Sequence, residues 1–259
     1  MELNNEAAIR TVRGREFLFV LYSQATRLPF VICDEESYND QAWLFAEEEE
    51  IKHFGKELAE KKYATIGMRY EKKNFGQLFG VLYAIGVNTV VWAAGNDRQE
   101  IELPKLARQA DYSKLEPAKR PMLNPSLELS GIYFMQEMRR PLTMEEHQAN
   151  GVKALEEELL ANLQRSEYYL PMTPDNDAPN DPKKMRFPFM KDKNGKILQP
   201  VFTDVMEVQK FSQGKQMRLI KLPFAKLKGV MLPNAEFFVV NPLGFNLVLN
   251  KDQMEKLTK

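Results

Sequence analysis

The sequence predicts an α/β (α+β) protein made of two similar domains, each a mixed β-sheet packed with short helices. Three observations predict this class: the length of 259 residues, an alternation of short apolar strand patterns with helical patterns, and an internal repeat. A chain of this length can bury most of its apolar surface as one large domain or as two domains of ordinary size. Strands that alternate with helices of this length are typical of a mixed sheet covered by helices.

The repeat consists of four blocks that occur in the same order in both halves. The paired blocks are 16–30 with 158–172, 45–54 with 202–211, 75–81 with 224–230, and 90–91 with 239–240. The first pair predicts, in both halves, a helix that runs into an extended Leu-Pro segment. The offset changes from block to block, so each half is expected to carry its own insertions in loops, where insertions are tolerated.

Both halves are expected to continue through the same elements. In the first half these are a hairpin of 28–33 with 42–45, a helix at 47–60, a strand at 64–68, a helix at 75–83, and strands at 89–93 and 100–103. In the second half they are a hairpin at about 185–202, a helix at 204–214, a strand at 217–221, a helix at 224–231, and strands at 237–241 and 245–249. Asn194-Gly195 supplies the turn of the second hairpin, because both central residues of a type I′ turn need positive φ.

The expected boundaries are 1–110 for the first domain, 111–143 for a linker and 144–259 for the second domain. The linker contains an amphipathic helix at 126–140, which Pro141 ends. After the linker, Thr143 and Glu146 form a capping-box pattern that opens the first helix of the second half.

The charge balance and the cysteine count exclude several classes of protein. Lys plus Arg number 36 and Asp plus Glu number 36, so no overall positive field is present to bind nucleic acid. No apolar run approaches the roughly 20 residues of a membrane span, and the first residues lack the features of a signal peptide, so we expect a cytoplasmic protein with no membrane contact. Cys33 is the single cysteine, and the acidic residues that follow it favour a buried structural thiol over a reactive one.

We expect no catalytic residues, no metal and no cofactor. His53 and His147 lie in different halves on predicted solvated helix surfaces, and no Cys/His cluster has ligand spacing. The acidic loop at 175–181 lacks the central Gly and the closing Glu of a calcium loop. The sequence also lacks the glycine-rich motifs that bind phosphates or dinucleotides and the nucleophile elbow of hydrolases.

The stretch that most resembles a site is the acidic run at 47–50, directly before Lys52 and His53. In the repeat alignment Glu50 falls on Glu207, whereas His53 falls on Lys210, so an acid and His pair is not kept in both halves. Carboxylates in the first turn of a helix suit the positive end of its dipole. We interpret the run as the capped, solvated start of a helix, with an acidic partner-binding face as the alternative.

Two short motifs of the second half carry a resemblance to a known family. One is Val201-Phe202-Thr203-Asp204 before a helix, and the other is Val239-Val240-Asn241-Pro242 at the end of an apolar strand. From about residue 124 onward the chain resembles the N-terminal domain of the enhanced serine sensitivity (SseB) family. The resemblance implies a bacterial, cytoplasmic α/β domain without established catalytic residues.

The first half then resembles a diverged second copy, with Trp92-Ala93 in place of the Asn-Pro pair. We take the family-motif residues as candidates for contact with a partner, and an alternative for the loop that holds the last three is a simple turn. These candidates are Phe202, Thr203, Asp204, Asn241, Pro242 and Gly244.

The sequence favours a non-enzymatic protein-interaction or regulatory protein that binds a protein partner, for example by strand addition to an exposed sheet edge. A homodimer is an open alternative for the partner. An alternative of a different class is an enzyme that acts on a small molecule in a cleft between the halves, with Glu50, Asp204 or Glu207 as acid and base groups. A third alternative is an immunity-type protein that binds a toxin or an effector.

Overall fold

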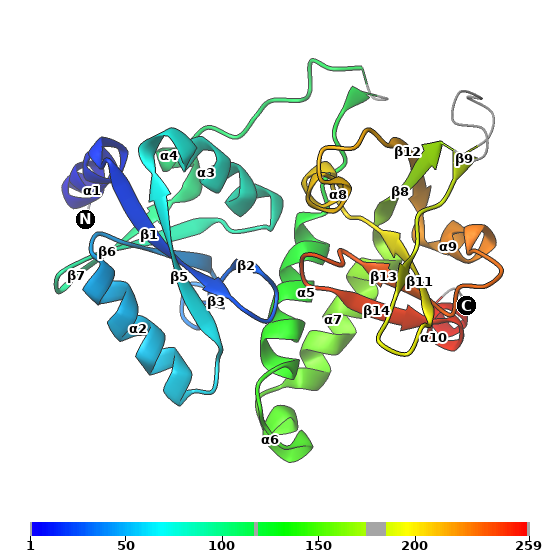
Figure 1. Cartoon of the computed structure of the whole chain (residues 1–259). Helices are drawn as coiled ribbons and strands as arrows, with labels where there is room; N and C mark the ends of the chain where they lie inside the picture. Colours follow the sequence, from blue (N-terminus) through cyan, green and yellow to red (C-terminus); the bar gives the residue numbers. More distant parts are fainter. Residues whose placement is uncertain (1, 117–118, 175–184, 258–259) are drawn as a thin grey trace. The chain divides into compact units, whose positions relative to one another are not determined.

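The computed structural model describes residues 2–116, 119–174 and 185–257 (Figure 1). The chain divides into two compact units. Unit 1 comprises Met1–Lys114 with Ile132–Leu155, and unit 2 comprises Leu115–Gly131 with Glu156–Lys259. These units differ from the expected boundaries, since residues 111–143 do not form a separate linker. Gln136 explains part of the difference, because its side chain binds both the N–H and the carbonyl of Val31 in unit 1, at 3.3 and 2.9 Å.

Unit 1 is built around a seven-stranded sheet. Its strands are β1 (Phe17–Ser23), β2 (Leu28–Pro29), β3 (Val31–Cys33), β4 (Asp40–Phe45), β5 (Thr65–Glu71), β6 (Thr89–Ala94) and β7 (Asp97–Glu102). The strand order is β2-β1-β4-β6-β7, with β3 also paired to β4 and β5 also paired to β1. β4 and β6 are parallel, and the other pairs are antiparallel.

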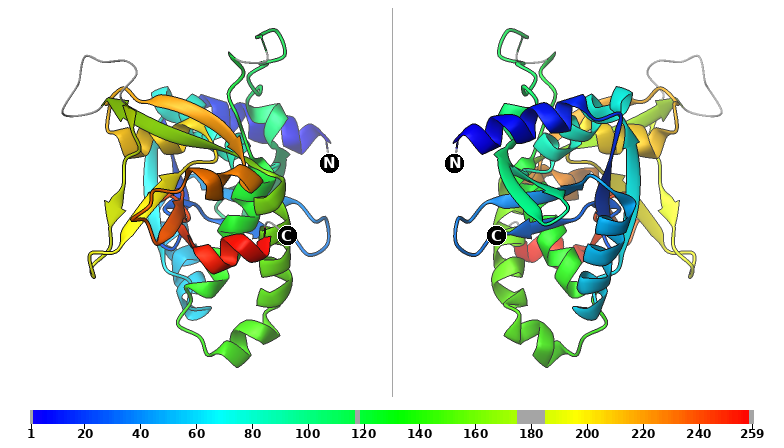
Figure 2. Two further views of the ribbon diagram at one scale, coloured as in Figure 1. Left: turned by 90° about the vertical axis from the view of Figure 1, so that its right-hand side faces the viewer. Right: turned by 90° about the vertical axis from the view of Figure 1, so that its left-hand side faces the viewer.

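Unit 1 also contains several helices. They are α1 (Glu2–Gly14), α2 (Glu48–Glu60), α3 (Phe75–Ala84), α4 (Leu103–Leu106), α6 (Met144–Ala149) and the short 3-10 helix η1 (Lys72–Asn74). Helix α5 (Pro125–Met138) is divided between the two units. α1 lies against β7, and α2 packs on β1 and β5 (Figure 2). The apolar face of α2, with Ile51 and Leu58, is buried beside Phe19 and Phe45 of the sheet.

The helix predicted for residues 16–21 is wrong, because these residues belong to β1. The helix of the first half is α1, which ends before β1 begins. Four consecutive apolar residues of β1, Leu18, Phe19, Val20 and Leu21, are buried. A strand that is covered on both faces has no period of two, so its pattern cannot be told from that of a buried helix segment. In the repeat predicted from sequence, block 16–30 therefore sets β1 against helix α7. The structural equivalent of β1 in the second half is the strand β8 (Glu167–Pro174).

Unit 2 contains a four-stranded sheet, β10-β11-β13-β14, and a three-stranded sheet, β12-β8-β9. The strands are β8 (Glu167–Pro174), β9 (Met185–Arg186), β10 (Met190–Lys191), β11 (Ile197–Val201), β12 (Arg218–Pro223), β13 (Phe237–Val240) and β14 (Leu247–Asn250). The helices are α7 (Val152–Arg165, shared with unit 1), α8 (Val205–Ser212), α9 (Phe224–Leu227), η3 (Lys228–Val230) and α10 (Lys251–Leu257). β10 and β11 form the predicted hairpin, but its turn is not the expected type I′, because Gly195 has a positive φ of 79° whereas Asn194 does not have a positive φ. The acidic loop at 175–181, which the sequence predicts to lack a calcium site, lies outside the described residues.

The two units share one pattern of strand pairing. β1 pairs antiparallel with β5 as β8 does with β12, β4 pairs parallel with β6 as β11 does with β13, and β6 pairs antiparallel with β7 as β13 does with β14. Phe19 is paired with Phe45 in unit 1, and a bridge joins Tyr169 to Phe202 in unit 2. These registers make Ala93 the equivalent of Asn241, which corrects the expected alignment by one residue.

Candidate functional site

The six family-motif residues lie together inside unit 2. β11 and β13 are parallel, so their carboxyl ends meet at one edge of the sheet, and the two motifs follow these ends. All six residues are buried: Phe202, Thr203, Asp204, Asn241, Pro242 and Gly244. Their side chains therefore do not offer a surface to a partner, and the partner-facing interpretation of these residues is wrong for the folded unit.

Glu128 of α5 joins the two motifs by hydrogen bonds. Asn241 donates from Nδ2 to Glu128 Oε1 at 2.5 Å and to Thr203 Oγ1 at 2.7 Å, and the Thr203 hydroxyl also donates to Glu128 Oε1. The backbone N–H of Thr203 donates to Asn241 Oδ1 at 3.1 Å. Asn241 has a left-handed φ of 47°, a conformation that Asn adopts more readily than most residues. The network fixes both loops to the helix.

Asp204 caps α8, and no reciprocal capping box with Glu207 is formed. Its Oδ1 accepts from the N–H groups of Met206 and Glu207 at 2.6 and 3.0 Å. The Glu207 side chain points elsewhere, to an ion pair with Lys210. A Cβ at Gly244 would lie 2.8 Å from Glu207 Oε2, so a larger residue at this position of the turn would have to displace the buried Glu207 carboxylate.

The three carboxyl groups of this cluster, Glu128, Asp204 and Glu207, disfavour one another's ionisation. Burial, followed by the charges of Asp204 and Glu207, raises the pKa of Glu128 well above its ordinary value. Burial also raises the pKa of Asp204 and of Glu207, and Lys210 partly offsets the effect. Glu128 Oε2 and Glu207 Oε2 are buried without a hydrogen-bond partner.

The cluster fits a structural role better than catalysis. Glu128 is 1% exposed, and Asp204 and Glu207 are each 3% exposed, so a substrate has no access to them in this conformation. Glu50, the third carboxylate of the enzyme hypothesis, belongs to unit 1. In the described part of the chain, no group of three His, Cys, Asp or Glu residues is arranged to hold a metal ion.

The acidic run at 47–50 is the start of α2, as predicted. Glu50 accepts from the backbone N–H of Glu47 at 3.0 Å and from that of Gly95, and Glu47 forms an ion pair with Arg15 at 2.9 Å. His53 lies on the exposed side of α2, 3.3 Å from Glu57. The run therefore acts in capping and surface ion pairing, and its histidine is not part of a site.

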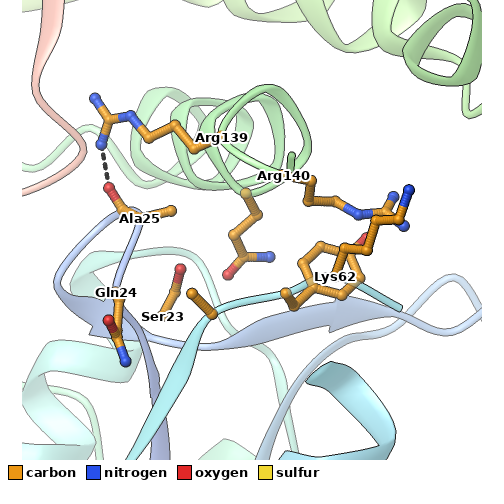
Figure 3. Close-up of a pocket in the computed structure, with 9 residues that line it drawn as sticks. Ser23, Gln24, Ala25, Lys62, Arg139 and Arg140 are labelled. Atoms are coloured by element: carbon orange, nitrogen blue, oxygen red, sulfur yellow. Dashed lines mark hydrogen bonds between the residues drawn. The ribbon is translucent and has the colours of Figure 1, made fainter. Parts of the chain in front are cut away.

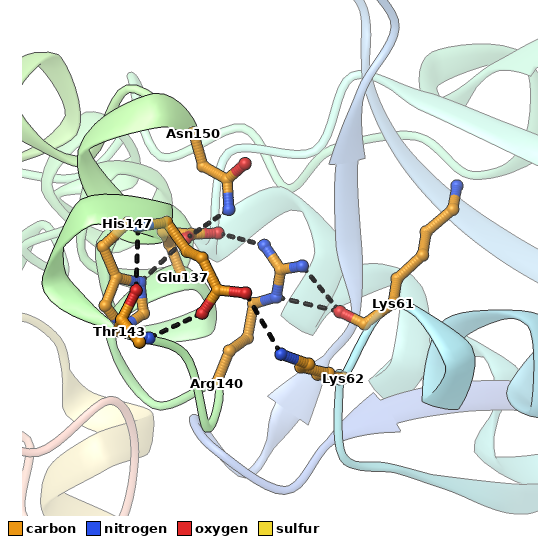
Figure 4. Close-up of polar contacts among 8 residues, drawn as sticks. Lys61, Lys62, Glu137, Arg140, Thr143, His147 and Asn150 are labelled. Carbon is orange, nitrogen blue, oxygen red and sulfur yellow. Dashed lines mark hydrogen bonds and ion pairs between the residues drawn. The ribbon is translucent and has the colours of Figure 1, made fainter.

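His147 was predicted to be solvated, and that prediction is wrong. The residue is 4% exposed, and its Nδ1 lies 2.9 Å from Glu137 Oε1 (Figure 4). Arg140 and Asn150 also donate to Glu137, at 2.6 and 3.0 Å. Burial opposes ionisation of Glu137, but hydrogen bonds from Asn150, His147 and Arg140 outweigh it, so its pKa lies below the ordinary value. Cys33 departs from expectation in the other direction, because it is exposed.

Figure 3 shows a pocket of about 220 Å³ in unit 1 whose wall includes the cationic side chains Lys62, Arg139 and Arg140. Lys62 lies 3.3 Å from Glu146, Arg140 lies 2.6 Å from Glu137, and Arg139 donates to the carbonyl of Ala25. These cations are engaged within the unit. The pocket therefore gives little support for an anion site.

The surface of unit 1 that lacks such internal partners is the outer edge of β5. β1 pairs with all seven residues of β5, and no other strand of the described chain pairs with it. Ile66 is 52% exposed and Met68 is 41% exposed on the same face of the strand. Tyr70 follows on that face, held by a 2.5 Å hydrogen bond between its hydroxyl and that of Tyr22.

A groove of about 320 Å³ runs between β5 and α2 on the opposite face of the strand. Its floor is apolar, and its lining includes Leu21, Ile51, Gly55, Ala59 and Gly67. Lys52 and Lys56 of α2 line the same groove. The edge of β5 thus combines free backbone groups with an apolar face on one side and a groove with two lysines on the other.

The sequence of β5 carries a signal for its apolar face. Ile66, Met68 and Tyr70 alternate with Gly67 and Arg69, which is the pattern of a strand with one apolar face. The pattern predicts a strand but does not say which neighbours it pairs with. The open edge follows from the pairing of β5 with β1 alone.

Comparison with protein families gives a match for the second half. Residues 143–256 match the model described as the SseB protein N-terminal domain. The chain therefore carries an SseB N-terminal domain in this range, which agrees with the resemblance carried by the motifs around Thr203 and Asn241. Glu128, which binds both motifs, lies before the matched range.

The other comparisons add little. The comparison with curated proteins gives no match. Among solved structures, the chain is similar to "Tic22 from Plasmodium falciparum" at 9% identity, with 97% of this chain and 93% of that chain covered and a TM-score of 0.22. A likeness at that score carries no argument about the fold or the function. Among the described residues, no helix has both the length and the apolar character needed to cross a membrane.

Proposed function

We propose that this SseB-domain protein is a non-enzymatic protein-interaction protein, which binds an extended protein segment along the open edge of β5. The observation that carries the proposal is a seven-residue strand that is fully paired on one side, unpaired within the described chain on the other, and lined by exposed Ile66 and Met68. An edge of this kind is a template for strand addition, in which backbone hydrogen bonds supply affinity and alternate side chains supply specificity.

The other long edges of the sheets are less suited to this role. β7 has the charged sequence DRQEIE, and α1 lies against it. β12 carries Lys221 and ends in Pro223, two devices that commonly protect an edge. β14 has four residues and is followed directly by α10.

We also infer that unit 1 is a diverged second copy of the SseB-type unit. The shared pattern of strand pairing supports this origin, as do the two aligned blocks at 45–54 with 202–211 and 75–81 with 224–230. In this proposal the first copy acquired the binding edge, whereas the equivalent strand β12 of the second copy ends in Pro223 and exposes less apolar side chain.

The proposal is tested by recovery of the partner on tagged full-length protein from extract of the source cells. Met68→Lys places a charge in the binding edge, and Val248→Lys is a matched control because Val248 is an exposed apolar strand residue of unit 2, 40% exposed against 41% for Met68. We expect one stoichiometric partner, or a second copy of the chain, with wild type and with Val248→Lys, and loss of it with Met68→Lys. Recovery that Met68→Lys leaves unchanged, or no stoichiometric association at all, contradicts the proposal.

A second candidate is an enzyme that uses the carboxyl groups of unit 2. The specific observation in its favour is that Asp204 and Glu207 come together with Glu128 and that burial raises all three pKa values. The near absence of solvent exposure opposes it. Hydrogen exchange that revealed a frequent opening of the 241–246 loop would favour this candidate, and protection equal to that of the β13 core would eliminate it.

A further inference from the structure

We propose that the occupant of the β5 edge is a second copy of this chain, paired with the first through β5 in an antiparallel, two-fold arrangement centred on Met68. This inference rests on the proposed function, because it identifies the extended segment that adds to the edge. A two-fold interface requires a surface that is complementary to itself. The backbone and the side chains of β5 both meet that requirement.

The backbone fixes the register. Gln24 N–H donates to the carbonyl of Ala64, and Lys72 N–H donates to that of Glu16, so residues 64 and 72 direct their backbone groups toward β1. Because the groups alternate along a strand, those of Thr65, Gly67, Arg69 and Glu71 point to the free edge. Antiparallel pairing centred on Met68 sets Gly67 opposite Arg69 and Thr65 opposite Glu71. Outward groups then meet outward groups from Gly67 to Arg69, and at the end of the strand Gln24 Nε2, which donates to the Thr65 carbonyl at 3.1 Å, has to release it.

The apolar face of the strand is complementary in the same register. Ile66 lies opposite Tyr70 of the second copy, and Met68 lies opposite itself. The exposed side chains of Ile66 and Met68 would thus both become buried from solvent in each copy, which is favourable. Pairs of this kind across neighbouring strands stabilise a sheet.

The other face supplies charge complementarity. Glu71 of the second copy arrives opposite Thr65, which lines the groove together with Lys52 and Lys56. Lys52 already pairs with Glu48 and Glu49 of its own helix, so Lys56 is the nearer candidate for an ion pair across the interface. Arg69 arrives opposite Gly67, over which Ile51 of α2 packs, since a Cβ at Gly67 would lie 3.2 Å from Ile51 Cδ1. The Arg69 side chain already lies 3.2 Å from Glu71 of its own strand, so it must stay clear of the groove.

Cysteine cross-linking tests the register. In a Cys33→Ser background, Met68→Cys places two thiols on the two-fold axis at a non-hydrogen-bonded pair, where the Cα atoms of opposite residues are about 4.5 Å apart, within the range of a disulfide. Ile66→Cys is the matched control, because its two copies would be four strand residues apart, roughly 13 Å. We expect a disulfide dimer of the full chain for Met68→Cys under mild oxidation, and at least about tenfold less for Ile66→Cys at equal concentration.

Sedimentation velocity tests the backbone pairing. Arg69→Pro removes an outward N–H without removing a β1 to β5 hydrogen bond, and Arg69→Ala removes the same side chain but keeps the N–H. Two backbone hydrogen bonds are lost per dimer, each worth roughly a factor of five, so Arg69→Pro should weaken dimerisation by at least about tenfold relative to Arg69→Ala. Circular dichroism and tryptophan fluorescence establish that both variants are folded.

Equal cross-linking of both cysteine variants, a wild-type chain that remains monomeric at all concentrations used, or a dimer that is insensitive to Arg69→Pro would each overturn the inference. If the chain is monomeric and Met68→Lys still abolishes capture of a different protein, the inference fails and the proposed function stands. If the chain is monomeric and no β5-dependent capture is found, both fail.

Discussion

Unit 1 and unit 2 share a pattern of strand pairing, yet they differ in which residues they bury. In unit 1 the edge strand β5 exposes Ile66 and Met68, whereas in unit 2 the equivalent strand β12 ends in Pro223 and its Leu219, Ile220 and Leu222 are half-buried. The family motifs are internal to unit 2. The comparison teaches that the residues that identify the SseB domain are internal to its fold, and that the open edge with exposed apolar side chains lies in the other unit.

The two units also differ in the partners of a buried glutamate on α5. Glu137 in unit 1 has Arg140, His147 and Asn150 as partners, whereas Glu128 in unit 2 has neutral donors and two further acids nearby. Their pKa values are displaced in opposite directions, downward for Glu137 and upward for Glu128. The two units should therefore respond oppositely to pH and to loss of the carboxylate.

The largest expected effect is from Glu137→Ala. The change leaves Arg140 and His147 buried without their acid, and breaking a buried ion pair costs about 3 kcal/mol or more. Both tryptophans, Trp43 and Trp92, lie in unit 1, so urea unfolding followed by tryptophan fluorescence reports this unit. Since the folded pKa of Glu137 is lowered, its contribution is present at neutral pH and is lost as pH falls through that pKa.

Glu146→Ala is the control for that experiment. Glu146 pairs with Lys62 on the surface, with a side chain that is 47% exposed, so its loss should cost less than about 0.5 kcal/mol. A similar loss of stability for both variants would contradict the assigned role of Glu137.

Gly244→Ala should destabilise unit 2 by about 2 kcal/mol, because its Cβ would meet the buried Glu207 carboxylate at 2.8 Å. Gly229→Ala is the matched control, since no atom lies within 4 Å of its Cβ. Unit 2 has no tryptophan, so far-UV circular dichroism should report a shifted transition while tryptophan fluorescence is unchanged. Equal stability of the two variants would show that the Glu207 side chain moves aside freely.

Glu128→Gln should stabilise unit 2 by about 1 kcal/mol at pH 8, because a neutral group of the same shape replaces one that resists ionisation. The pKa of Glu128 is raised in the folded state, so the folded state holds a proton that the unfolded state releases, and stability falls as pH rises from the ordinary to the raised value. The variant should lose this fall between pH 5 and pH 8 in urea titrations. If the pH dependence of stability were the same in the variant and in wild type, Glu128 would not be the group that holds the proton in the folded state.

The smallest effect on stability is expected for Met68→Lys, within about 0.5 kcal/mol, because Met68 is a partly exposed edge residue. Its effect on association should nevertheless be the largest of these variants. Thermal unfolding measured beside sedimentation separates the two properties. If Met68→Lys lost association only because it had unfolded, the result would not support a role of Met68 in binding.

Much of the fold was predictable because local patterns determine it. The hairpin at β10 and β11, the helix α5 and the alternation of elements after residue 45 follow from turn chemistry and from apolar spacing. β1 was not predictable in this way, because Leu18 to Leu21 are all buried and have no strand period. The domain boundaries differed because Gln136 binds unit 1 from a helix that was assigned to a linker.

The candidate sites were less predictable, because they depend on contacts between distant residues. His147 is polar and has a helical position that suits the surface, and only its contact with Glu137 makes it a buried residue. Glu128 has no motif of its own, and its importance appears only where Thr203 and Asn241 meet it. The edge of β5 depends on which strand pairs with β1, which no local pattern determines.

Residue-resolved amide hydrogen exchange along β5 tests the central claim most directly, because it reports whether the outward backbone groups acquire a partner. The inward amides of Ile66, Met68 and Tyr70 should be protected at every concentration by their bonds to β1. The outward amides of Gly67 and Arg69 should exchange rapidly in dilute protein and become at least about tenfold slower when the chain self-associates or holds its partner. Outward amides that remain unprotected in the associated state would contradict the claim that β5 is the binding edge.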